Sequence, residues 1–225
     1  MLKWDLKKDE LIEGQWIHAP ILNFSINSDA SLILCFVQSY KPQHEYGTWV
    51  ALSKPPWFTA LALWQIGDSW GGGGSFLTDK KIYISPTPSQ HIFHGALPKG
   101  IKWTAELPKS GYSDLSGWKQ EKEGSYTRYS KNQKNSPFEI ESVDGKRKIY
   151  ANKPKKTLLT LPLVPFDAEI DPKGRLIFTS TEGIIYRGTL KANELQIEEL
   201  FDLSKMKPKP IKAPYPTFVK KKKVE

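Results

Sequence analysis

The sequence predicts an all-β protein, either a small β-propeller or a propeller-like array of antiparallel sheets, with a β-sandwich as the alternative. Seventeen prolines and sixteen glycines are spread along the 225 residues, so few windows of twelve residues lack a helix breaker. Two segments far apart in the chain have the pattern of a β-hairpin. They lie 144 residues apart when Phe24 is matched to Ala168, which equals three units of about 48 residues, near the size of a propeller blade.

Each of these hairpins consists of two apolar runs that flank a short turn. In the first, Phe24–Ile26 and Leu32–Val37 flank Asn27–Ser31. In the second, Ala168–Ile170 and Leu176–Phe178 flank Asp171–Arg175. Further strands are predicted at 48–52, 81–85, 125–129, 138–143, 147–151 and 183–190.

Other stretches are less regular. Residues 57–64 are apolar almost without interruption, which fits a buried strand or a two-turn helix that begins after Pro55-Pro56. Residues 98–136 are polar and lysine-rich, with four glycines, and are predicted to be mostly loop with short strands. From about Met206 the chain carries four prolines and is predicted to be extended.

We therefore expect one β-rich domain over residues 1–205, with a basic, loop-rich insert at about 99–156 and a Pro/Lys-rich tail at 206–225. The net charge of +9 is concentrated in the insert and the tail. The insert carries 14 Lys/Arg against 7 Asp/Glu, and residues 205–225 carry 8 against 1. These regions could attract an acidic partner or phosphates, or could be solvated loop and chain end.

The single cysteine, Cys35, lies within the apolar run 32–37, so it is predicted to be a small core residue in a reducing compartment. No apolar run is long enough to span a bilayer. These observations predict a soluble cytoplasmic protein that does not engage a membrane.

The most specialised segment is 53–76, which contains three tryptophans and five glycines. Large rings beside residues without side chains indicate backbone that closely approaches another segment, a ligand or a partner. The candidate binding residues there are Trp57, Trp64, Asp68, Trp70, Gly71, Gly72, Gly73 and Gly74. Core packing is the alternative for the tryptophans, and turn capping is the alternative for Asp68.

Other chemistry has little support in the sequence. The four glycines lack the lysine and the following helix of a phosphate loop. His91 and His94 are spaced so that the rings would point to opposite faces of a strand, so we expect no metal and no cofactor. Paired carboxylates for hydrolysis could come only from scattered residues: Asp68, Asp114, Asp167, Glu169 and Asp171.

Arg175 and Arg187 could each anchor a partner or form an internal salt bridge, and the salt bridge is favoured.

Five stretches together resemble a family of uncharacterised bacterial proteins. They are Glu13-Gly14-Gln15-Trp16, the Asn27-Ser28-Asp29 turn, Ser53-Lys54-Pro55-Pro56-Trp57-Phe58-Thr59-Ala60-Leu61-Ala62-Leu63-Trp64, Gly67-Asp68-Ser69-Trp70-Gly71-Gly72-Gly73-Gly74 and Asp171-Pro172-Lys173-Gly174-Arg175-Leu176. The similarity spans most of the chain outside 99–156, with Lys54 in place of the family's arginine. It implies a bacterial, cytosolic, β-rich protein, and it assigns no activity and no catalytic residue.

The function expected from the sequence is a binding or interaction module without a visible active site. Its binding edge would be built from residues 55–76, and its partner would be a protein that it neutralises or regulates; the basic insert favours an acidic partner. The alternatives are a carboxylate-dependent hydrolase and a nucleic-acid binder that uses the basic insert and tail.

Overall fold

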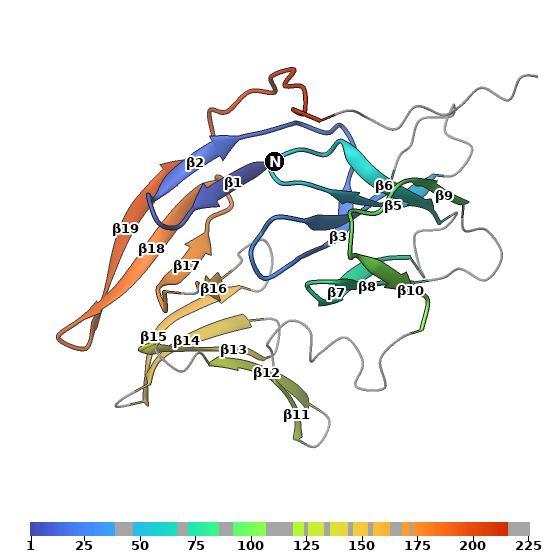
Figure 1. The fold of residues 1–225 in the computed structure, drawn as a ribbon. Coiled ribbons are helices and arrows are strands. Elements are labelled where there is room, and N and C mark those ends of the chain that lie inside the picture. Colours follow the sequence, from blue (N-terminus) through green and yellow to red (C-terminus); the bar gives the residue numbers. More distant parts are fainter. Residues whose placement is uncertain are drawn as a thin grey trace, which may run out of the picture. The chain divides into compact units, whose positions relative to one another are not determined.

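The chain is all-β. The computed structural model describes residues 1–38, 47–66, 72–85, 92–106, 119–123, 126–132, 136–143, 146–152, 155–162, 168–171 and 173–215. These residues contain nineteen strands and no helix (Figure 1). No helix in this described part is long and apolar enough to cross a membrane. The prediction of the all-β class is confirmed, and the propeller arrangement stays a prediction.

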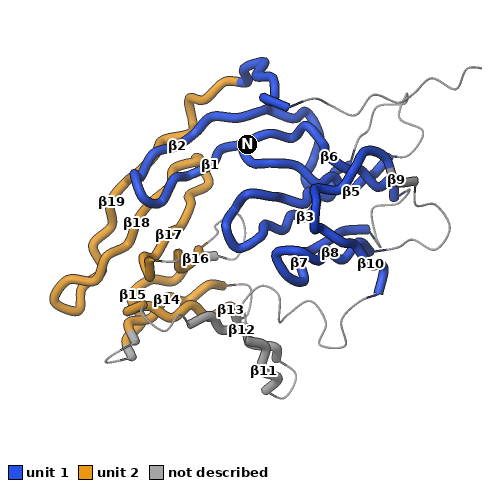
Figure 2. The backbone as a smooth tube through the Cα atoms, in the orientation of Figure 1, with its two compact units in different colours: residues 1–109, 208–225 blue, residues 110–207 orange. Residues whose placement is uncertain are grey.

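The chain divides into two compact units (Figure 2). Unit 1 comprises residues 1–109 and 208–225, and unit 2 comprises residues 110–207. The boundary at 109 falls inside the basic stretch 99–156. The described part of that stretch contains five complete strands, β10 to β14. Polar residues alternate with aromatic or aliphatic ones in β13 and in much of β14, which suits strands with one exposed face.

Unit 1 contains three sheets. A hairpin pairs β1 (Leu2–Asp5) with β2 (Glu10–Glu13). A five-stranded antiparallel sheet has the order β3-β4-β5-β6-β9. Its strands are β3 (Ile21–Ile26), β4 (Ile33–Gln38), β5 (Thr48–Ser53), β6 (Ala60–Gln65) and β9 (Ile92–Gly95). A third sheet has the order β10-β8-β7, with β7 (Gly74–Thr78), β8 (Lys81–Ile84) and β10 (Lys102–Thr104).

The core of unit 1 lies between the five-stranded sheet and the three-stranded sheet. Side chains from β4, β5 and β6 form one cluster with Phe76, Ile82 and Ile84 of β7 and β8. The opposite face of β4 forms a smaller cluster, in which Ile33, Cys35 and Val37 are covered by residues that include Met1, Ile17 and Phe58. Because successive side chains of a strand point to opposite faces, the uninterrupted apolar run of β4 is buried on both sides.

Unit 2 contains two antiparallel meanders. One is β11 (Lys119–Glu123), β12 (Tyr126–Asn132), β13 (Phe138–Val143), β14 (Lys146–Asn152) and β15 (Lys155–Pro162). The other is β16 (Ala168–Ile170), β17 (Leu176–Thr179), β18 (Ile184–Lys191) and β19 (Glu194–Asp202). Their shared core includes Phe138, Ile140, Ile149, Leu176 and Phe178.

Both predicted hairpins are present. β3 pairs with β4, and β16 pairs with β17, each antiparallel. Residues 57–64 do not form a helix: the strand β6 begins at Ala60, and the preceding residues form a turn. One face of β6 lies in the core, where Ala62 and Trp64 are buried, and the residues of the other face are half-buried. This alternation of burial is that of a strand with one core-facing side.

Candidate functional site

The proline-tryptophan stretch forms the turn between the central strands β5 and β6. We call residues Lys54–Thr59 the PPW turn. The Trp57 N–H donates a hydrogen bond to the Lys54 carbonyl at 2.9 Å, and the Pro55–Pro56 bond is cis. Both prolines are buried, Lys54 is exposed, and Trp57 is half-buried.

Gly14 and Gln15 hold the PPW turn from one side. The Gln15 N–H donates to the Pro56 carbonyl at 3.0 Å. The Gln15 side-chain oxygen accepts bonds from the Phe58 N–H at 2.8 Å, the Thr59 N–H at 2.8 Å and the Thr59 hydroxyl at 3.0 Å. A Cβ on Gly14 would lie 1.8 Å from the Pro56 carbonyl oxygen, so only glycine fits there. Two of the stretches singled out in the sequence, Glu13–Trp16 and Ser53–Trp64, thus form one junction.

The C-terminal segment 208–215 lies against the PPW turn from another side. The Tyr215 hydroxyl donates to the Thr59 carbonyl at 2.8 Å and accepts from the Lys54 N–H at 3.3 Å. The Tyr215 ring meets the Trp57 ring edge-on, with centroids 6.1 Å apart, and the Lys54 ammonium lies 5.5 Å from the Tyr215 centroid. Burial raises the pKa of Tyr215, and the hydrogen bond from the Lys54 backbone opposes that rise.

Trp64, by contrast, belongs to the core of unit 1. Its exposed fraction is 0%, and its ring meets Trp103 edge-on with centroids 6.0 Å apart. Core packing, the alternative that the sequence left open, is therefore the arrangement found for Trp64. A ligand cannot stack on this ring while the sheet is intact.

The described part of the glycine stretch also serves packing. A Cβ on Gly72 would lie 2.3 Å from the Phe36 ring and 2.9 Å from Ile66. Gly73 and Gly74 are buried, and Gly74 begins β7. The close approach predicted for these glycines is thus an approach to the chain's own core. Asp68, Trp70 and Gly71 lie outside the described residues, so their predicted roles stay predictions.

The strand β3 carries an apolar surface that the sequence did not single out. We call Ile21, Phe24 and Ile26 the β3 patch; their exposed fractions are 40%, 63% and 46%. They lie directly opposite Val37, Cys35 and Ile33 of β4, so they share a face with these residues. On β4 this face is covered, whereas on β3 it faces solvent. The apolar pattern predicted the strand, but only the packing shows which strand is covered.

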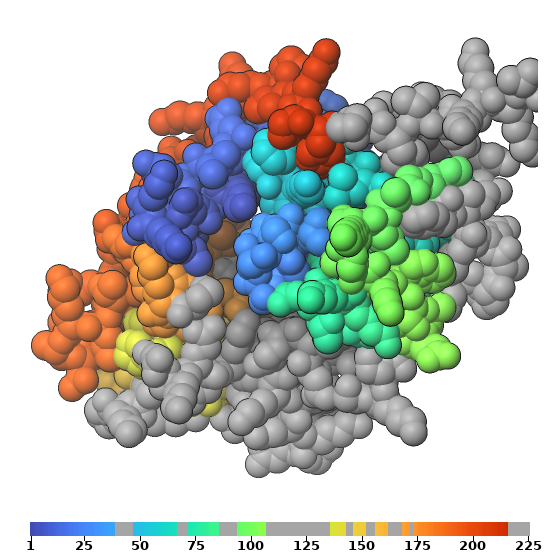
Figure 3. Space-filling view, in the orientation of Figure 1, coloured from blue at the N-terminus to red at the C-terminus, as the bar shows by residue number. Residues whose placement is uncertain are grey.

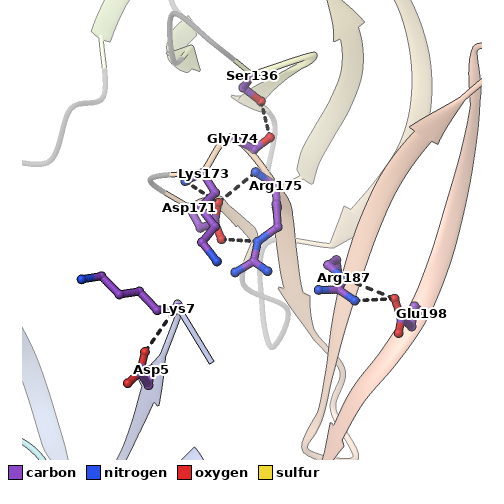
Figure 4. A network of polar contacts seen from close by, with 9 residues as sticks. All are labelled: Asp5, Lys7, Ser136, Asp171, Lys173, Gly174, Arg175, Arg187 and Glu198. Carbon is purple, nitrogen blue, oxygen red and sulfur yellow. Dashed lines mark hydrogen bonds and ion pairs between the residues drawn. The ribbon is translucent and has the colours of Figure 1, made fainter. Parts of the chain in front are cut away.

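Unit 2 contains the second predicted turn and both predicted arginine ion pairs (Figure 4). Asp171 Oδ1 accepts bonds from the Lys173 and Arg175 N–H groups, both at 2.9 Å, and Asp171 Oδ2 accepts from Arg175 Nε at 2.7 Å. The Ser136 hydroxyl donates to the Gly174 carbonyl at 3.0 Å. Arg187 pairs with Glu198 at 2.8 Å on the neighbouring strand. The internal salt bridge, favoured for both arginines, is confirmed.

The two turns that the sequence matched at a spacing of 144 have similar hydrogen bonds. Asn27 Oδ1 accepts from the Leu32 N–H at 2.9 Å, and its backbone carbonyl accepts from Ala30. The carbonyl of Asp171 likewise accepts from Gly174. Ala30 and Gly174 occupy the same place in their turns, and both have positive φ, +54° and +76°. The side chain at the first position caps each turn.

The buried carboxylate of Asp171 is therefore used by its own turn. Asp114 and Asp167, like Asp68, lie outside the described residues, so the hydrolase alternative stays a prediction. Within the described ranges no group of three His, Cys, Asp or Glu side chains could hold a metal ion.

Cys35 is buried, and burial raises the pKa of its thiol to about 11, which suits a core residue and not a nucleophile.

Comparison of the chain with protein-family models, with curated proteins and with solved structures found no match.

Proposed function

We propose that the chain is a protein-binding module that docks its partner on the β3 patch. The observation that carries this proposal is the exposure of Phe24, 63%, on a sheet face that is buried one strand away. Exposed large apolar side chains that gather on one element are typical of a docking surface. A protein partner is the expected occupant because the patch is the continuation of a sheet face and is not an enclosed cavity.

The position of β3 in its sheet supports this proposal. β3 is the edge strand of the order β3-β4-β5-β6-β9. Its opposite face is occupied within unit 1, since the Ser25 hydroxyl accepts a hydrogen bond from the Phe76 N–H at 3.1 Å. The face that carries the β3 patch is the one on which a partner could bury apolar area. Burying one such side chain contributes roughly 1.5–3 kcal/mol.

The charge of the chain favours an acidic partner. The net charge is +9, and a basic protein associates faster with an acidic one through long-range attraction. A cytoplasmic setting, which the single buried Cys35 suits, belongs to the same proposal.

The test places a photo-crosslinking amino acid at position 24 and, as the matched control, at position 197. Ile197 is also an exposed apolar strand residue, 51% exposed, and it lies on β19 of unit 2. We expect position 24 to capture a partner in lysate of the source organism that position 197 does not capture. The partner is then purified, and its affinity is measured for the unmodified chain and for the Phe24→Ser and Ile197→Ser variants.

We expect Phe24→Ser to weaken the complex by about tenfold or more, as for a central interface residue, and Ile197→Ser to change it less than about twofold. The urea unfolding midpoint of each variant shows whether its fold is retained. Equal affinity of Phe24→Ser and the unmodified chain would contradict the proposal. If position 24 captures only a second copy of this chain, the β3 patch is a surface for self-association and the proposal of a different partner protein is wrong.

A further inference from the structure

The described part of the tail, 208–215, has the character of an extended ligand. It contains three prolines and has no strand or helix. In the space-filling view the red atoms of this segment meet the cyan atoms around the PPW turn (Figure 3). A proline-rich extended segment has little conformational freedom to lose on docking, which is why such segments often serve as ligands.

Tyr215 is the residue by which this segment is recognised. Its hydroxyl donates to one backbone group of the turn and accepts from another, Thr59 C=O and Lys54 N–H. Its ring lies edge-on to Trp57. A phenylalanine at this position would keep the contact with Trp57 but would lack the hydroxyl that bonds to Thr59 C=O and Lys54 N–H. The arrangement therefore favours tyrosine over phenylalanine.

The PPW turn is held in place without the tail. Its shape depends on β5, on β6 and on the hydrogen bonds to Gln15. The two prolines further restrict its backbone. The docking surface would therefore keep its form if the tail left it, which is the property of a preorganised site.

The rest of the tail contributes little that would prevent its departure. A second polar contact of the tail is the ion pair between Lys209 and Glu13 at 2.8 Å, whose side chains are 61% and 36% exposed. Exposed ion pairs of this kind are weak. Pro208, Pro210, Lys212 and Pro214 are exposed as well, whereas Ile211 and Ala213 are, like Tyr215, half-buried. Tyr215 is the residue of this segment whose side chain bonds to the PPW turn.

We propose that the PPW turn is a docking site for an extended Pro-Tyr segment of a partner protein, and that the chain's own Pro214-Tyr215 fills this site until the partner displaces it. This site is separate from the β3 patch. The tethered tail competes at a high effective concentration, so a free peptide binds the unmodified chain poorly. Removing the Tyr215 side chain from the tail opens the site.

The probe is a fluorescent peptide with the sequence of residues 206–218, and the readout is its anisotropy on titration with the full chain. We expect the Tyr215→Ala chain to bind the peptide at least tenfold more tightly than the unmodified chain does. The Lys212→Ala chain, changed at an exposed position of the same tail, should behave like the unmodified chain. Adding Trp57→Ala to Tyr215→Ala should weaken binding at least fivefold.

A second probe changes the peptide and leaves the chain intact. A peptide with Phe in place of Tyr215 should bind the Tyr215→Ala chain at least fivefold more weakly, since it lacks the hydroxyl. Equal binding of the tyrosine peptide to the unmodified and Tyr215→Ala chains would overturn the proposal. So would the absence of binding when the Tyr215→Ala chain is titrated to about 1 mM, or equal binding of the two peptides.

Discussion

The side-chain oxygen of Gln15 accepts hydrogen bonds from both the backbone N–H and the hydroxyl of Thr59, at 2.8 and 3.0 Å. The same oxygen accepts the Phe58 N–H at 2.8 Å. One amide thus pairs three donors of a turn that lies more than forty residues further along the chain. The hydrogen bonds thus join the Gly14-Gln15 pair to the turn that contains Pro55 and Pro56.

Replacement of Gln15 by leucine should destabilise unit 1. The variant keeps the size of the side chain and removes the acceptor, which leaves three partly buried donors without it. We expect a loss of about 2–3 kcal/mol in the free energy of unfolding, measured by urea titration with tryptophan fluorescence. Thr59→Val removes one of the three donors and should cost about 1 kcal/mol. A loss for Gln15→Leu no larger than that for Thr59→Val would contradict the shared-acceptor arrangement.

Gly14→Ala should be more damaging still. The new Cβ would lie 1.8 Å from the Pro56 carbonyl oxygen and 2.6 Å from its carbonyl carbon, and backbone atoms of a paired turn cannot move aside cheaply. We expect a loss of about 3 kcal/mol or more. The control is Gly100→Ala, where no atom lies within 4 Å but φ is +86°, at a cost of about 1–2 kcal/mol. Similar unfolding midpoints for the two variants would show that Gly14 tolerates a side chain.

The arginine ion pairs Arg175–Asp171 and Arg187–Glu198 of unit 2 should differ in their contribution to stability. Asp171 is 8% exposed, and it accepts bonds from the backbone N–H groups of Lys173 and Arg175 in addition to pairing with the Arg175 side chain. Asp171→Ala should therefore cost about 2–3 kcal/mol. Glu198 pairs with Arg187, but its side chain is 61% exposed, so Glu198→Ala should cost less than about 1 kcal/mol. Urea unfolding of both variants tests this, and the reverse order of the two losses would contradict it.

Cys35 should be unreactive in the folded protein. Its side chain is buried, and the raised pKa of about 11 keeps the thiol protonated at pH 8. We expect Ellman's reagent at pH 8 to label Cys35 only at the rate of unfolding, and to label it fully within minutes in denaturing urea. Rapid labelling without urea would show that the covered face of β4 opens readily.

The same thiol should make stability depend on pH in the alkaline range. The pKa of Cys35 rises from 9.0 in the unfolded chain to about 11 in the fold. Between these values the unfolded state releases a proton that the folded state retains, so the free energy of unfolding falls as pH rises from 9 to 11. Below pH 9 the group has no effect. The check is the difference between the unmodified chain and Cys35→Ala, since tyrosines and lysines titrate equally in both. Parallel stability curves from pH 8 to 11 would contradict the prediction.

Much of unit 1 and unit 2 was predictable at the level of strands. β13 spans the predicted residues, and β5, β8, β14 and β18 differ from the predicted strands by one residue at one or both ends. Strands with weak patterns were missed. β19 reads Glu-Leu-Gln-Ile-Glu-Glu-Leu-Phe-Asp. Its first five residues alternate between polar and apolar, but Glu199 breaks the alternation and no continuous apolar run is present, so the signal for a strand is short.

The candidate site was predictable only in part. The sequence indicated the PPW turn and Trp57 as special, but Trp57 and Trp64 are alike in type and in their apolar surroundings. The fold buries Trp64 between two sheets and leaves Trp57 at a turn. Phe24 was predicted to lie on a strand, and the alternation of Asn23-Phe24-Ser25-Ile26 indicates that the face with Phe24 is the covered one. Only the packing shows that this face is exposed on β3, although it is covered at Cys35 on the next strand.

The sequence by itself determined the all-β class, the two matched hairpins and the burial of Cys35, because these follow from alternation, turn chemistry and apolar runs within a few residues. The tertiary structure decided which apolar face stays exposed and which segments meet at the PPW turn. Gln15 reaches Thr59 across 44 positions and Tyr215 reaches it across 156. Such contacts depend on how strands separated in the chain come to lie side by side, and no local pattern of residues encodes that pairing.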